Sequence, residues 1–90
     1  MPYRFFSNIG TANALREQVT AAIRNDEQLL LELDDAPVTV TIKSVLRHDE
    51  ELVVTTNETQ DKSTILLHIP YSTDPQTAAQ AELISYTEGA

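Results

Sequence analysis

Cysteine is missing from this 90-residue chain, and glycine occurs only twice. Without cysteine there are no disulfides, no thiolate catalysis and no cysteine-ligated metals. Two glycines cannot form the glycine-rich loops that hold phosphates or dinucleotides. The longest apolar runs, 29–31 and 65–67, are far shorter than a membrane span, and the first residues do not resemble a secretion signal. We therefore expect a soluble, cytoplasmic protein with no membrane association.

Positive charge is also scarce, because six basic residues face fourteen acidic ones and the net charge is −8. Residues 1–47 hold five basic and six acidic residues, a net of −1, whereas residues 48–90 hold one basic and eight acidic residues, a net of −7. Proteins that bind nucleic acid usually present a basic face, so this balance disfavours nucleic acid as a partner.

Three interpretations of the acidity stay open. Like charge keeps a small protein from aggregating, and an acidic surface also suits a partner with a basic surface. The third interpretation is a salt-rich cytoplasm, because two lysines and eleven threonines among many acids are similar to the composition of proteins from halophilic archaea.

Residues 11–25 have the periodicity of an amphipathic helix. The apolar side chains lie on one stripe at a spacing of 3.6 residues; they are Ala12, Leu15, Val19, Ala22 and Ile23. Thr11 suits the N-cap position, and Gly10 lets the chain turn before the helix.

Alternation of apolar and polar side chains predicts strands over 38–47, 52–56 and 63–69. In the first of these strands the apolar face is assigned to Val38, Val40, Ile42 and Leu46. The short segment 3–6 is compatible with a further strand at the front of the chain.

Two segments are ambiguous between helix and strand. A strand is favoured for residues 26–33, because a continued helix would place acidic side chains at its C-terminus, where the helix dipole opposes them. Residues 76–86 follow Asp74 and Pro75, which suit the cap and first position of a helix. They are compatible with a short C-terminal helix or with a last strand.

These elements predict one α+β domain over residues 1–90. We expect an N-terminal helix packed on an antiparallel meander of four to five strands, since the helix stripe and the apolar sheet face must cover each other. The sheet is either a small open sheet or an SH3/Sm-like barrel.

Few side chains here could carry chemistry. Residues 48–51 contain His48 and three acids, and with His68 they form the one group of residue types that suits zinc or manganese. His48 falls in a predicted turn, as do the adjacent carboxylates at 34–35 and 50–51, where water surrounds them. We expect no catalytic residue, no cofactor and no metal, and therefore no enzyme; a metal-assisted hydrolase around the two histidines is the enzymatic alternative.

The second face of the sheet has some apolar character, because Val45 and Leu66 are assigned outward positions beside Val53 and Leu30. A partly apolar outer face favours a partner, most simply a second copy of the chain in a homodimer. Acidic residues around the predicted turns add a surface for a basic protein partner. The candidate interaction surface comprises Val45, Val53, Leu66, Glu50, Glu51, Glu58 and Asp61.

A helix followed by short strands over 37–42, 52–54 and 65–71 resembles the Sm-type small barrel. The resemblance is one of topology and covers most of the chain; it implies a barrel that binds RNA through a basic rim. This chain lacks the glycines that the family carries in its bent strands. With a helix over 76–86 the element order is instead similar to double-stranded-RNA-binding domains, without their lysines at the start of that helix.

The sequence therefore predicts a small acidic, non-enzymatic protein-interaction or regulatory module that self-associates, with a partner of basic or apolar surface. The alternative is an Sm-like nucleic-acid-binding protein adapted to high salt. That alternative depends on the basic residues of the front half, namely Arg16, Arg24, Lys43 and Arg47.

Overall fold

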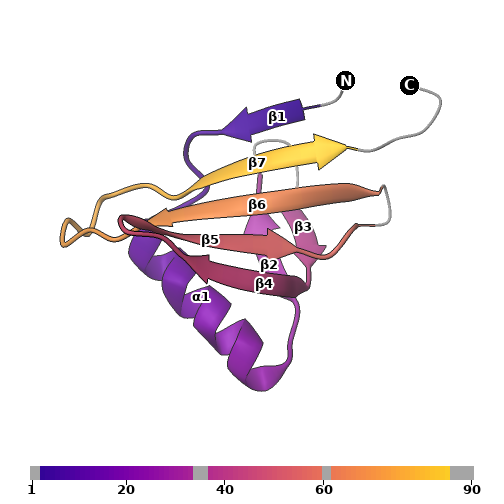
Figure 1. The fold of residues 1–90 in the computed structure, drawn as a ribbon, viewed down its shortest axis with the longest axis horizontal. Coiled ribbons are helices and arrows are strands. Elements are labelled where there is room, and N and C mark those ends of the chain that lie inside the picture. Colours follow the sequence, from indigo (N-terminus) through magenta and orange to yellow (C-terminus); the bar gives the residue numbers. More distant parts are fainter. Residues whose placement is uncertain (1–2, 34–36, 60–61, 86–90) are drawn as a thin grey trace.

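A computed structural model describes residues 3–33, 37–59 and 62–85 of the chain. These residues form one helix and seven strands (Figure 1). In chain order the elements are β1 (Tyr3–Phe6), α1 (Ala12–Asn25), β2 (Leu29–Glu32), β3 (Pro37–Val40), β4 (Ile42–Arg47), β5 (Glu51–Thr56), β6 (Ser63–Pro70) and β7 (Gln80–Ser85).

Helix α1 begins and ends as its sequence predicts. The Thr11 hydroxyl accepts a hydrogen bond from the backbone N–H of Ala14 at 3.3 Å, which satisfies one of the free donors of the first turn. Asp26 ends the helix in the left-handed conformation, with φ of 54°. Four of the five predicted stripe residues are buried, whereas Ile23 is 54% exposed.

Five strands form one antiparallel sheet in the order β1-β7-β6-β5-β4. The four strands from β4 to β7 pair with their chain neighbours and form the predicted meander. Strand β1 then adds to the free edge of β7, where Tyr3 pairs with Ile84 and Phe6 with Ala81. The front strand considered for residues 3–6 is therefore present, and the helix that we predicted as the N-terminal element is the second element of the chain.

Strands β2 and β3 form a separate hairpin, in which Leu29 pairs with Val40 and Leu31 with Val38. The strand favoured for residues 26–33 is confirmed over Leu29–Glu32: Leu29 and Leu31 are buried, and Leu30 and Glu32 are exposed.

The predicted strand 38–47 is divided at Thr41 between the hairpin and the larger sheet. Asn57 holds this bend, since its backbone N–H donates to the Thr41 carbonyl at 2.9 Å and its side-chain amide to the Thr41 hydroxyl at 2.8 Å. The sheet does not close into the SH3/Sm-like barrel that we considered. Over the described residues, its edge strands, β1 and β4, pair neither with each other nor with the hairpin strands β2 and β3.

The C-terminal helix considered for 76–86 is wrong over the described residues, where β7 forms a strand. Asp74 does make a cap-like bond, because its carboxylate accepts from the backbone N–H of Gln76 at 2.9 Å. Such local bonds support a single turn as readily as a helix. After the turn, Ala79 and Ala81 are fully buried against the rest of the core.

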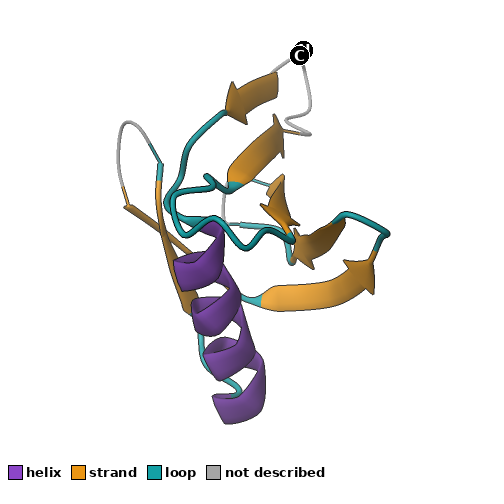
Figure 2. Cartoon of the chain, turned by 90° about the vertical axis from the view of Figure 1, so that its left-hand side faces the viewer, coloured by secondary structure: helices purple, strands orange, loops and turns teal. Residues whose placement is uncertain are grey.

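Helix α1 and the hairpin lie on the same side of the five-stranded sheet (Figure 2). The apolar core lies between this layer and the sheet. It consists of Phe6, Ala12, Leu15, Val19, Ala22, Leu29, Leu31, Leu33, Val40, Val54, Ile65, Leu67, Ile69, Ala79 and Ala81. Side chains alternate across a sheet, so every second residue of β6 is buried in this core. The intervening residues point to the opposite side, which no described element covers.

Candidate interaction surface

The uncovered side of the five-stranded sheet is termed the outer face. Residues paired across antiparallel strands share a face, so the register identifies its members. One row runs from Leu46 through Val53 and His68 to Gln80; a second runs from Thr55 through Leu66 and Glu82 to Phe5; Tyr3 and Ile84 form a third pair.

Apolar side chains occupy both ends of the outer face. Leu46 is 57% exposed at the β4 edge, and Tyr3 and Phe5 are each 51% exposed at the β1 edge. Val53 and Leu66 are half-buried between them. Single exposed apolar residues are common on protein surfaces, but several of them on one uncovered sheet face are typical of an interaction surface.

A chain of polar side chains crosses the middle of the outer face. The Tyr3 hydroxyl donates to Oε1 of Glu82 at 2.5 Å, and Oε2 of Glu82 lies 2.5 Å from Nε2 of His68. Nδ1 of His68 lies 3.3 Å from Oε2 of Glu51. Both nitrogens of the imidazole therefore face a carboxylate, and the ring is held between β5 and β7.

These contacts shift the protonation of three groups. Burial disfavours the charged imidazole, but the hydrogen bonds to Glu82 and Glu51 and the charges of both acids outweigh it, so the pKa of His68 is raised above 6.5. The hydrogen bonds from Tyr3 and His68 lower the pKa of Glu82 below 4.5. The hydrogen bond to Glu82 raises the pKa of Tyr3 above 10.0.

This arrangement does not form a metal centre. Glu51 and Glu82 contact opposite nitrogens of His68, so the three side chains do not converge on one point as metal ligands must. Within residues 3–33, 37–59 and 62–85, no group of three His, Asp or Glu side chains is arranged to hold a metal ion. His48 is exposed in the turn between β4 and β5.

The apolar residues predicted for the interaction surface are only partly brought together. Val53 and Leu66 lie on the outer face as predicted, whereas Val45 pairs with Val54 and packs against the core. The outward position assigned to Val45 is therefore wrong. The register of β4 against β5 shifts between Ile42 and Ser44, and one extra residue in a strand moves every later side chain to the other face. Leu46 becomes outward for the same reason.

The predicted acidic residues do not lie together. Glu51 takes part in the outer-face network, Glu50 is exposed in the turn that precedes β5, and Glu58 is exposed after the far end of that strand. The six residues of β5 lie between Glu50 and Glu58 and span roughly 20 Å, so these two acids are far apart. Asp61, like the acidic pair at 34–35, lies outside the described residues.

Sequence reasoning missed the contributions of Tyr3, Phe5 and Glu82 to this surface. Tyr3 and Phe5 alternate with Arg4 and Phe6, which signals a strand with one exposed face. Nothing in that pattern shows which strand β1 joins, because β1 and β7 are separated by most of the chain.

No family model matches the chain, and no curated protein or solved structure matches it either. Across the part of the chain that the structure describes, no helix is long and apolar enough to cross a membrane. What the fold defines is a small α+β protein with one uncovered sheet face.

Proposed function

We propose that this chain is a non-enzymatic protein-interaction module of the cytoplasm that self-associates through its outer face. The observation that carries the proposal is the one-sided covering of the five-stranded sheet. Domains normally bury each apolar sheet face against a second layer, but here α1 and the hairpin share one side (Figure 2). A second copy of the chain supplies the missing layer.

A face-to-face dimer suits the arrangement of the outer face. In a two-fold interface the same surface serves both copies. If the axis runs along the strands, the β4 edge of one copy lies over the β1 edge of the other. The apolar ends at Leu46 and Phe5 can then pack on one another across the axis. The contacts that join Tyr3, Glu82, His68 and Glu51 are all made within one copy.

Net charge opposes this assembly at low salt. Each copy carries −8, and like charges repel over about 10 Å at 0.1 M salt but only about 3 Å at 1 M. Self-association should therefore strengthen as salt is raised, because salt screens the repulsion between the acidic copies and lets their apolar outer faces associate.

The solution mass tests the proposal directly. Light scattering after gel filtration, at about 0.05 M and about 2 M potassium chloride, should show a dimer that is favoured by salt. The double substitution Phe5→Gln and Leu46→Gln keeps the net charge and should return the chain to a monomer. Leu30→Gln is the matched control, because Leu30 is 56% exposed but lies on the hairpin. A wild-type chain that stays monomeric at high salt and millimolar concentration would contradict the proposal.

The alternative of an Sm-like nucleic-acid-binding protein loses its topological support, because the sheet is open. Its basic residues lie on two elements: Arg16 and Arg24 on α1, and Lys43 and Arg47 on β4. A filter-binding titration with mixed RNA at low salt, where phosphate contacts are strongest, measures this alternative separately from self-association.

A further inference from the structure

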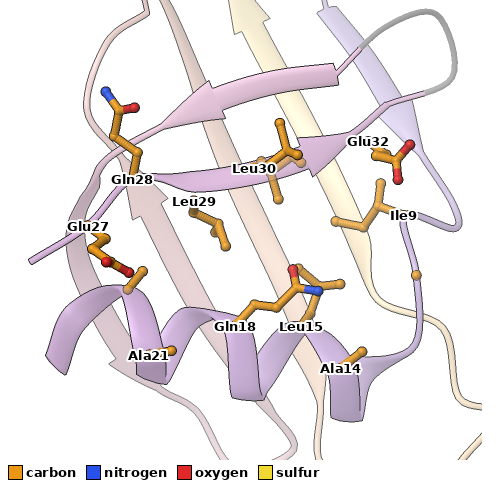
Figure 3. Close-up of a pocket in the computed structure, with 13 residues that line it drawn as sticks. Ile9, Ala14, Leu15, Gln18, Ala21, Glu27, Gln28, Leu29, Leu30 and Glu32 are labelled. Atoms are coloured by element: carbon orange, nitrogen blue, oxygen red, sulfur yellow. The ribbon is translucent and has the colours of Figure 1, made fainter. Parts of the chain in front are cut away.

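A second surface lies on the side of the five-stranded sheet opposite the outer face. It is a groove of about 510 Å³ between α1 and β2 (Figure 3). One wall is the helix face formed by Ala14, Gln18 and Ala21, and the other is β2. Ile9 closes one end. The two alanines leave space on the helix wall that longer side chains would fill.

Strand β2 presents an unpaired edge to this groove. It pairs with β3 on one side, and in residues 3–33, 37–59 and 62–85 no other strand pairs with it. Figure 3 shows β2 between β3 and α1, so the edge away from β3 faces the helix. An unpaired strand edge is a template for another extended segment, since main-chain hydrogen bonds supply affinity and neighbouring pockets select side chains.

The charge of the groove selects the kind of segment. Glu27 lies near the entrance to β2 and Glu32 at its far end, and both are exposed. Among the described residues that line the groove there is no lysine or arginine. Between the two acids the lining is mostly apolar, with Leu30 exposed on the strand itself.

We infer that this groove binds an extended peptide segment of a partner protein, one that has alternating apolar residues between basic ends and adds as a third strand to β2. The basic ends meet Glu27 and Glu32, and the apolar side chains lie against Ile9 and the alanines of α1. A second copy of this chain fits less well at this edge, because its own β2 is flanked by the same two acids, Glu27 and Glu32, which would then face like charges. The inference goes beyond self-association, since the groove and the outer face lie on opposite sides of the sheet.

A defined peptide tests the inference. The probe is a fluorescein-labelled, end-blocked peptide in which valine and threonine alternate between a terminal lysine and a terminal arginine. Fluorescence anisotropy at low salt should show saturable binding to the full chain. The backbone amides of Leu29–Glu32 should shift in ¹⁵N-correlated NMR spectra and exchange more slowly with deuterium once the peptide is bound.

Charge reversal at the groove provides the matched comparison. The double substitution Glu27→Lys and Glu32→Lys should weaken peptide binding at least about tenfold, because both acids are exposed and face the basic ends. The double substitution Glu17→Lys and Glu58→Lys makes the same change in net charge at exposed positions outside the groove, and binding should fall much less.

Three results would overturn the inference: no saturable binding at millimolar peptide, equal weakening by both charge-reversed pairs, or amide shifts confined to the outer face. The Phe5→Gln and Leu46→Gln chain separates the two proposals. It should bind the peptide as the wild type does, whether or not the wild type forms a dimer.

Discussion

His68 on β6 and Glu82 on β7 are diagonal neighbours across the outer face, with Nε2 of the imidazole 2.5 Å from Oε2 of the carboxylate. Diagonal pairs of this kind are within reach of long side chains in antiparallel sheets. Glu82 also accepts from Tyr3 on β1, and His68 contacts Glu51 on β5. One polar network therefore connects four adjacent strands at the centre of a surface with apolar ends.

This network predicts that stability falls as the pH rises through the titration of His68. A raised histidine pKa in the folded chain means that the contribution to stability is complete below pH 6.5 and is lost above the folded value. Substituting Glu82→Gln removes the stronger carboxylate contact and should move the His68 pKa down. Imidazole C–H resonances followed by NMR against pH measure that shift.

Thermal unfolding at pH values of about 5.5 and 8.5 gives the corresponding change in stability. The wild type should lose more stability between these values than the Glu82→Gln chain does. Glu58→Gln is the control, because Glu58 is exposed and separate from the network, and it makes the same change in net charge. A Glu82→Gln chain with the wild-type pH dependence would show that the contact with His68 does not stabilise the fold.

On the acid side, the network predicts that Tyr3→Phe makes the protein more sensitive to low pH. The Tyr3 hydrogen bond is the main cause of the lowered Glu82 pKa. A lowered carboxylate pKa contributes stability above pH 4.5 that is lost as the pH falls through the folded value. Without the hydroxyl, Glu82 should protonate at higher pH, and acid unfolding should begin earlier.

The carboxyl ¹³C resonance of Glu82 reports that protonation directly. Tyr71→Phe is a matched control, because Tyr71 is also partly exposed but its hydroxyl is 3.4 Å from Nε of Arg47 rather than close to Glu82. If both substitutions move the Glu82 titration equally, the short contact with Tyr3 is not its cause.

Local patterns predicted most of the elements but little of the outer face. Alternating side chains identified β2 and β6, and the 3.6-residue stripe identified α1, because each signal depends only on neighbours in the chain. The register shift of β4 between Ile42 and Ser44 has no signal in the sequence pattern. It places Val45 and Leu46 on the opposite faces to those predicted. Alternation counts residues and cannot detect an extra one.

The network itself depends on pairing that sequence does not reveal. His68 lies 17 residues from Glu51 and 14 from Glu82, and the three meet only because β5, β6 and β7 pair in one register. The same reasoning applies to residues 76–86, where helix propensity was favourable but the free edge of β6 selected a strand. Tertiary pairing of this kind commonly overrides local preference.

Two adjacent leucines of β2 should respond very differently to truncation. Leu31 is 2% exposed in the core, whereas Leu30 is 56% exposed. Leu31→Ala should lower the free energy of unfolding by about 2–5 kcal/mol, because it leaves a cavity. Leu30→Ala should change it by no more than about 0.5 kcal/mol. Urea titrations of both variants measure the difference, and similar losses would mean that β2 does not face the core as described.

Gly10 is a position at which the backbone itself requires glycine. Its φ of 133° lies in a region that residues with a side chain rarely adopt, and a Cβ there would lie 3.0 Å from Cδ2 of Leu15. The segment cannot relax easily, because the Gly10 carbonyl accepts from the N–H of Ala79 at 2.8 Å and the Ile9 N–H donates to the Ala79 carbonyl at 3.1 Å.

Gly10→Ala should therefore lower the free energy of unfolding by about 1–3 kcal/mol, the usual range for a strained backbone position. Urea unfolding measures the loss, and the Leu15 methyl resonances should shift because the new Cβ contacts that side chain. Asn8→Ala is the control: it removes only the exposed hydrogen bond from Gly10 N–H to the Asn8 side chain, at 3.0 Å. A Gly10→Ala chain as stable as the wild type would show that the turn before α1 adopts a conformation open to residues with a side chain.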